Sequence, residues 1–243
     1  MRPLRRSIGS ALALASALGL LGLCLGPAQA QNMGPKIWDI KLGTPVDALP
    51  LDNFVDPACG TNGGPPSRVL KGFNEFALCP VERTTGLHEV WFRYDDEMEY
   101  VARARRSEIM VRQYRANSLA GQPIITSLLI DGKGQVQGYR VVNDPRIEGN
   151  TRIAAFGLAD VFKGIAGMGL KCTDLPLAEG ERPIDDWFVK ESCEKTGDGV
   201  VVHIEARRFY KVGQAAVDVD NRLTENQFES SARIELYRPP APR

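Results

Sequence analysis

The 243-residue sequence has no excess of charge of either sign, because 30 basic side chains balance 30 acidic ones. Proteins that bind nucleic acids normally carry a basic excess, so this balance argues against a nucleic-acid partner. The sequence also lacks a second long apolar run, which excludes a membrane protein with several helical spans. With 43% hydrophobic residues, the chain has enough apolar material to fold, which excludes a disordered protein.

Motifs that identify many enzymes and metal sites are absent as well. The sequence contains no Gly-x-Ser-x-Gly, no His-Glu-x-x-His, no phosphate-binding P-loop and no dinucleotide-binding glycine pattern. It has no Cys-x-x-Cys, and its cysteines lie too far apart along the chain for the close pairs that zinc sites use. We therefore expect no cofactor, no resident metal and, on balance, no catalytic activity.

The N-terminal segment has the pattern of an export signal. Three arginines precede an uncharged run rich in Leu and Ala over residues 8–25, and Ala28-Gln29-Ala30 follows. This pattern predicts a secretory signal peptide at residues 1–30, with an uncleaved anchor as the alternative. The mature chain, residues 31–243, would hold 27 basic and 30 acidic side chains, a net charge of −3. We expect a periplasmic or secreted protein that is not inserted in the membrane after cleavage.

Four cysteines remain after cleavage, and an oxidising compartment allows them to pair. Four cysteines permit three connectivities. The spacing favours Cys59–Cys79 and Cys172–Cys193, which close two rings of similar length. The first ring contains Gly60-Thr61-Asn62-Gly63-Gly64-Pro65-Pro66, a segment with no regular structure that a crosslink would restrain. We predict two structural disulfides.

Hydrophobic periodicity and turn residues predict an α+β fold: mostly antiparallel sheet, with two or three helices between runs of strands. Residues 124–130 are almost uniformly apolar or β-branched, which predicts a central strand covered on both faces. The strands are expected at 37–42, 86–94, 123–130, 135–142, 200–210 and 230–237, and the helices at 44–49, 96–116 and 151–163.

A weak internal repeat would divide the mature chain into halves at 31–146 and 147–243. Shifting the sequence by 114 residues places Cys79 on Cys193, and one inserted residue later His88 falls on His203. Two unrelated strands that each follow a loop would give the same pattern, so both interpretations stay open.

Few residues qualify as candidate ligands. His88 and His203 are the two histidines, and imidazole titrates near neutral pH and binds metals. Asp95 and Asp96 begin a dense acidic cluster where a strand is expected to lead into a helix. Acids at a helix N-terminus also stabilise the helix dipole, so a purely structural role explains them equally well.

Three functions are compatible with these features. The first is a disulfide-stabilised binding or accessory protein without catalysis, whose partner is a small molecule or another envelope protein. The second is a periplasmic hydrolase that uses carboxylates and a His, since such enzymes leave little trace in the sequence. The third is a structural subunit of a cell-envelope complex. A pocket lined by His88 or Asp95 would favour the second, and a large apolar patch would favour the third.

Overall fold

The structure is a computed structural model that describes residues 34–146, 149–211 and 228–240. The predicted signal peptide at residues 1–30 and the predicted start of the mature chain at Gln31 lie outside these ranges. Within them, no helix is both long and apolar enough to cross a membrane.

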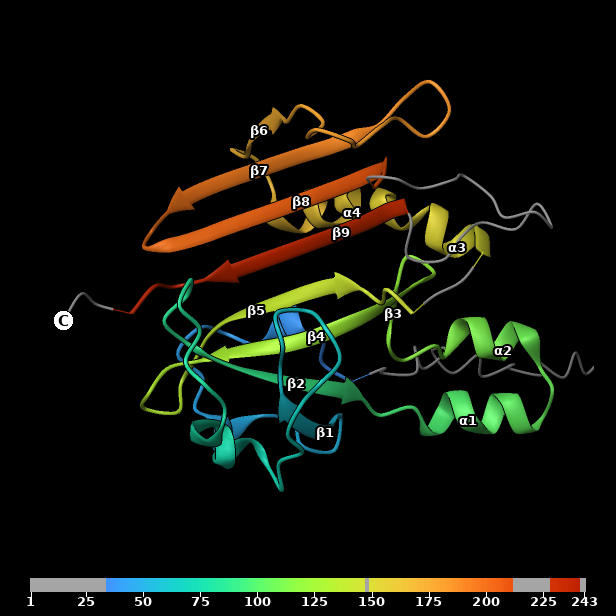
Figure 1. Cartoon of the computed structure of the whole chain (residues 1–243). Coiled ribbons are helices and arrows are strands. Elements are labelled where there is room, and N and C mark those ends of the chain that lie inside the picture. The colour runs from blue at the N-terminus through green and yellow to red at the C-terminus, as the bar shows by residue number, and fades with distance from the viewer. Residues whose placement is uncertain (1–33, 147–148, 212–227, 241–243) are drawn as a thin grey trace, which may run out of the picture. The chain divides into compact units, whose positions relative to one another are not determined.

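The described residues form a nine-strand sheet in which every strand pair is antiparallel (Figure 1). The strand order is β1-β2-β4-β5-β9-β8-β7-β6, and β3 pairs with β4. The predicted α+β fold with mostly antiparallel strands is confirmed. The strands are β1 (Phe54–Cys59), β2 (His88–Tyr94), β3 (Ser118–Leu119), β4 (Gln122–Ile130), β5 (Val136–Asn143), β6 (Lys171–Asp174), β7 (Val189–Gly197), β8 (Val200–Tyr210) and β9 (Phe228–Tyr237).

The helices are few and short, and of those described only α1 and α4 exceed six residues. α4 packs on one face of β8 and β9 through Leu158, Ala159 and Phe162, all buried (Figure 1). The α-helices are α1 (Glu97–Ala104), α2 (Glu108–Gln113), α3 (Gly149–Ile153) and α4 (Leu158–Ala166); the 3-10 helices are η1 (Ile37–Asp39), η2 (Val46–Ala48), η3 (Phe73–Leu78) and η4 (Ala155–Gly157).

Eight of the nine strands form two four-strand meanders that meet at the β5–β9 pair. One runs β1-β2-β4-β5 and the other β6-β7-β8-β9. His88 lies on β2, second from one edge, whereas His203 lies on β8, third from the other edge. The sequence shift that aligns the two histidines therefore matches strands at different places in the two meanders. A true repeat between residues 31–146 and 147–243 stays a prediction.

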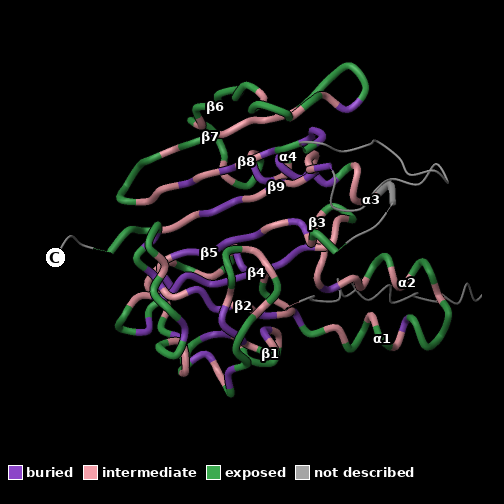
Figure 2. The backbone as a smooth tube through the Cα atoms, viewed as in Figure 1, coloured by how far each residue is buried: buried purple, intermediate pink, exposed green. Residues whose placement is uncertain are grey.

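Side chains alternate between a core face and a polar face of the sheet. The core face carries Val90, Phe92, Leu128, Val141 and Ile234, which belong to one apolar cluster together with α4. The other face carries charged and hydroxyl side chains in the β5–β9–β8 region, and we call it the polar face. Figure 2 shows that the central strands are the most deeply buried part of the described chain.

β4 is the strand that the apolar run predicted, and its central position is confirmed. It lies between β2 and β5, and all residues from 124 to 130 are buried. Leu128 and Ile130 contribute to the core cluster, whereas Leu129 points to the opposite face and is also fully buried. The segment between β1 and β2 supplies the second cover, because Gly60 and Gly63 approach Glu89 and Val142 on that face.

Four expected elements differ from the structure. The helix expected at 44–49 is only the three-residue 3-10 helix η2. Residues 37–42 form no strand: Asp39 accepts a hydrogen bond from the N–H of Lys36, which closes the 3-10 turn η1. The helix expected at 96–116 is two helices, because Arg106 has a φ of +53° and Ser107 is extended. The helix expected at 151–163 is divided into α3, η4 and α4.

Candidate functional site

The polar face carries two rows of side chains that run across neighbouring strands. In the first row Glu194 pairs with His203, His203 with Glu235, and Glu235 with Arg140. In the second row Ser192 pairs with Glu205, Glu205 with Arg233, and Arg233 lies beside Val142. Residues directly opposite in antiparallel strands have adjacent side chains, so this face concentrates the charged groups of the sheet.

Arg140 on β5 forms ion pairs with three glutamates from different parts of the chain. Its Nη1 lies 2.7 Å from Oε1 of Glu82 and 2.7 Å from Oε2 of Glu89. Its Nε donates a 2.5 Å hydrogen bond to Oε1 of Glu235. The Arg140 side chain is 1% exposed and that of Glu89 is 3% exposed. We call these four residues the Arg140 cluster.

Burial and charge oppose each other in this cluster, and charge prevails. Burial alone would raise the pKa of Glu82 and of Glu235, but Arg140 holds both pKa values below the ordinary range through hydrogen bonds and its charge. Burial alone would lower the pKa of Arg140, but hydrogen bonding to Glu82 and the charges of the three glutamates raise it. Arg140, Glu82 and Glu235 are therefore ionised at neutral pH, and their ion pairs act as a structural network.

The Arg140 cluster also fixes the loop that follows β1. The N–H of Asn62 donates a 2.6 Å hydrogen bond to Oε2 of Glu89, and Arg233 donates to both the backbone and the side-chain oxygen of Asn62. A Cβ on Gly60 would lie 2.3 Å from Cδ of Glu89, so the loop can approach this closely only with glycine there. Oε1 of Glu89, which lies close to Gly60, has no hydrogen-bond partner among the described residues.

Beside this loop lies a cavity of about 290 Å³ that we call the basic pocket. Among the described residues that line it, four are cations and two are carboxylates, which is an excess of two positive charges. The walls come from the loop after β1, the end of β5, α3, and the neighbouring strands β8 and β9. The lining residues are Gly63, Val142, Asn143, Pro145, Arg152, Glu205, Arg207, Lys211, Glu229, Ser230, Ser231 and Arg233.

The cations of the basic pocket are held to different degrees. Arg207 lies 2.7 Å from Glu205, and Lys211 lies 3.0 Å from Glu229, but both cationic side chains are 45% exposed. Arg152 donates to the carbonyl of Pro145 and stacks over the ring of Phe228, with no carboxylate partner among the described residues. Exposed ion pairs contribute little energy, so Arg207 and Lys211 can turn toward a bound anion, and Arg152 has no described carboxylate to leave.

The two histidines predicted as candidate ligands lie far apart. β2 and β8 are separated by three strands, which corresponds to about 19 Å at the usual strand spacing. Nδ1 of His88 is 2.7 Å from the carbonyl oxygen of Cys79, and its ring packs edge-on against Phe76. These contacts are those of a histidine that packs in the fold and does not bind a ligand.

His203 has the more polar surroundings. Its Nε2 lies 3.1 Å from Oγ of Ser192 and 3.6 Å from Oε1 of Glu205. Both partners approach the same ring nitrogen. In a Ser-His-acid triad the carboxylate orients the opposite nitrogen, so these three residues do not form one.

The two candidate acids lie at the end of β2. Asp95 is exposed, and its N–H donates to the carbonyl of Asn53. Asp96 immediately precedes α1 and lies 3.0 Å from Nη1 of Arg93, which also binds Asp56. Asp96 is therefore an acid at the start of a helix that is paired with an arginine, which fits a structural role better than ligand binding.

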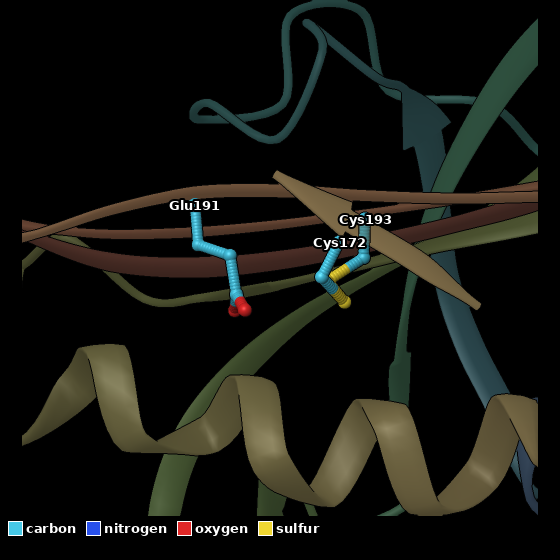
Figure 3. A group of neighbouring side chains, drawn as sticks. All are labelled: Cys172, Glu191 and Cys193. Carbon is cyan, nitrogen blue, oxygen red and sulfur yellow. A yellow bond between two sulfur atoms is a disulfide. The ribbon is translucent and has the colours of Figure 1, made fainter. Parts of the chain in front are cut away.

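Both predicted disulfides, Cys59–Cys79 and Cys172–Cys193, are present. Glu191 lies with Cys172 and Cys193 in the one group of potential metal ligands found among the described residues (Figure 3). The two sulfurs are bonded to each other, and Glu191 is paired with Lys163 at 2.5 Å. A metal would need free thiolates, so the oxidised form does not provide this site.

The Arg140 cluster and the basic pocket are not predicted by the sequence patterns. One signal was available: Arg140 interrupts an apolar strand between Tyr139 and Val141, where an unpaired charge could not be buried. Its partners Glu82 and Glu235 are 58 and 95 residues away, which no local pattern reveals. Comparison with known proteins adds no relative, because no protein-family model, curated protein or solved structure matches this chain.

Proposed function

We propose that this chain is a non-catalytic binding or accessory protein of the periplasm or the extracellular space, and that its ligand is a small anionic molecule. The basic pocket carries this proposal, since it gathers Arg152, Arg207, Lys211 and Arg233 around about 290 Å³. Two disulfides support an oxidising compartment, in agreement with the export signal expected at residues 1–30.

The pocket offers the donors that a carboxylate or phosphate group requires. The planar guanidinium groups of Arg152 and Arg207 can each donate two parallel hydrogen bonds to such an anion. Arg233 is already committed to Asn62 and Glu235, so it contributes charge and holds the wall in place. Ser231 adds a hydroxyl, which now donates to Glu229. Arg152, Arg207 and Lys211 would bind the ligand, and Arg233 would preserve the pocket.

The size of the pocket limits the ligand. About 290 Å³ is near the lower end of the range for small-molecule sites, so a compact acid fits better than a long chain. Within the described part of the chain the pocket is partly open and its lining is mostly polar, as expected for an ion that exchanges with solvent.

A titration with defined anions tests this proposal. Citrate and inorganic phosphate are added to the purified protein, and binding is followed by calorimetry and by amide chemical shifts. We expect saturable binding that weakens with added salt. The double variant R152Q/R207Q should weaken binding about tenfold or more, because each lost charge-assisted hydrogen bond removes about 1.5–3 kcal/mol.

The matched control is R112Q, which removes an arginine on α2 whose side chain is 80% exposed and outside the basic pocket. This variant should bind as the parent does. Equal weakening in R112Q would show that the anions respond only to overall charge. Failure of both anions to saturate would reject an anion site in the basic pocket.

A further inference from the structure

The two disulfides differ in exposure. Cys59 and Cys79 are both part of the buried core, at 1% and 3% exposure. Cys193 is fully buried as well, but its partner Cys172 is exposed. One residue of the second disulfide is therefore exposed, whereas neither residue of the first is.

The position of Cys172 in the sheet explains this exposure. It lies on β6, a four-residue strand at the edge of the sheet, and every residue of β6 is exposed. Cys172 is directly opposite Cys193 on β7, so the disulfide crosses the last strand pair. Beyond β6 no further strand covers this edge in the described part of the chain.

We infer that the Cys172–Cys193 disulfide is a thiol-exchange site, which a small thiol such as glutathione modifies at Cys172. The thiolate of the small molecule attacks Sγ of Cys172, and the bond between Cys172 and Cys193 breaks. A new disulfide joins the small molecule to Cys172. Cys193 leaves as a thiolate and takes a proton from water, so the number of disulfides is unchanged.

The neighbouring charges control the rate of this step. The carboxylate of Glu191 lies within 4.8 Å of both sulfurs and repels an incoming thiolate (Figure 3). Lys163, 2.5 Å from Glu191, offsets part of that repulsion. Removing the negative charge of Glu191 should therefore accelerate attack at Cys172.

Mapping of exchange in the native protein tests this inference. The purified protein with both disulfides formed is incubated with reduced glutathione, quenched with N-ethylmaleimide and digested for mass spectrometry. We expect a glutathione adduct on Cys172, with Cys59–Cys79 intact at the same time. The rate at Cys172–Cys193 should exceed that at Cys59–Cys79 by about tenfold or more, since exchange requires access to a sulfur.

The variant E191Q provides a second measurement, with circular dichroism to verify that it is folded. It should form the Cys172 adduct several-fold faster than the parent, and the other disulfide should be unaffected. Equal exchange rates at the two disulfides, an adduct mainly on Cys193, or faster reaction of Cys59–Cys79 would overturn the inference. These outcomes are independent of anion binding in the basic pocket.

Discussion

Arg140 and Glu89 are both almost completely buried, and Nη1 of the arginine lies 2.7 Å from Oε2 of the glutamate. Arg140 lies on β5 and Glu89 on β2, and β4 lies between these strands. Arg140 also forms ion pairs with Glu82 and Glu235. Buried charges are tolerated only when they are paired and hydrogen-bonded, so each member of the cluster depends on the others. This dependence leads to measurable consequences for stability.

Replacing Arg140 by Met should destabilise the protein by about 3–5 kcal/mol, because it leaves the three glutamates without their shared cation. The free energy of unfolding is measured with urea. R112M is the matched control, since Arg112 pairs with Glu108 and the two side chains are 80% and 88% exposed. That variant should lose less than about 1 kcal/mol. Similar losses in both variants would refute a special role for the buried cluster.

The cluster should also make stability depend on acid. The pKa values of Glu82 and Glu235 are lower in the folded protein than their ordinary value, so the unfolded chain binds more protons in acid. Their contribution is complete above about pH 4.5 and is lost as pH falls through their folded-state pKa values. Urea unfolding between pH 7 and pH 3 should show this decrease. In R140M the decrease should be smaller, and an unchanged slope would contradict the assignment.

Replacing Gly60 by Ala should destabilise the protein by about 1–3 kcal/mol, because the added Cβ would contact the pinned side chain of Glu89 at 2.3 Å. Gly132→Ala is the control, since a Cβ there meets nothing within 4 Å. Thermal unfolding compares the two variants. A G60A protein as stable as G132A would mean that Glu89 can move aside.

Amide exchange should be slowest in β4. Residues 124–130 are all buried, and β4 is hydrogen-bonded to both β2 and β5. β6, exposed and at an edge, should exchange much faster. Hydrogen–deuterium exchange followed by mass spectrometry of peptides from both strands makes the comparison. Comparable rates in β4 and β6 would argue against this account of the sheet.

The exported protein should begin at Gln31. The three arginines, the apolar run at 8–25 and Ala28-Gln29-Ala30 motivate this prediction. The intact mass of protein collected outside the cytoplasm decides it. A mass that includes residues 1–30 would exclude cleavage and favour the anchor.

Parts of the fold that depend on neighbouring residues in the sequence could be predicted, and parts that depend on distant contacts could not. The apolar run at 124–130 is sufficient to identify β4 as a buried central strand. β7 was missed because its sequence, Val189–Gly197, is polar, and only Cys193 in it is buried. The break between α1 and α2 has no Gly or Pro to mark it, and α2 has no buried residue that would fix its ends.

The site was less predictable than the fold for a related reason. The disulfides could be assigned because each ring spans a short stretch of chain. The Arg140 cluster and the basic pocket require β5, β8 and β9 to lie side by side, and this order follows from the topology of the sheet. His88 and His203 were candidates because they are the two histidines of the chain, but they lie on strands separated by three others and form no common site.

The junction of the two meanders constrains the order in which this chain can fold. β5 is complete at residue 143, but its partner β9 begins only at residue 228. A chain that is made or exported from its N-terminus must therefore hold β5 as an open edge, with Arg140 lacking Glu235, until almost all of the chain has emerged. Closing this pair joins residues 95 positions apart and completes the sheet in one late event.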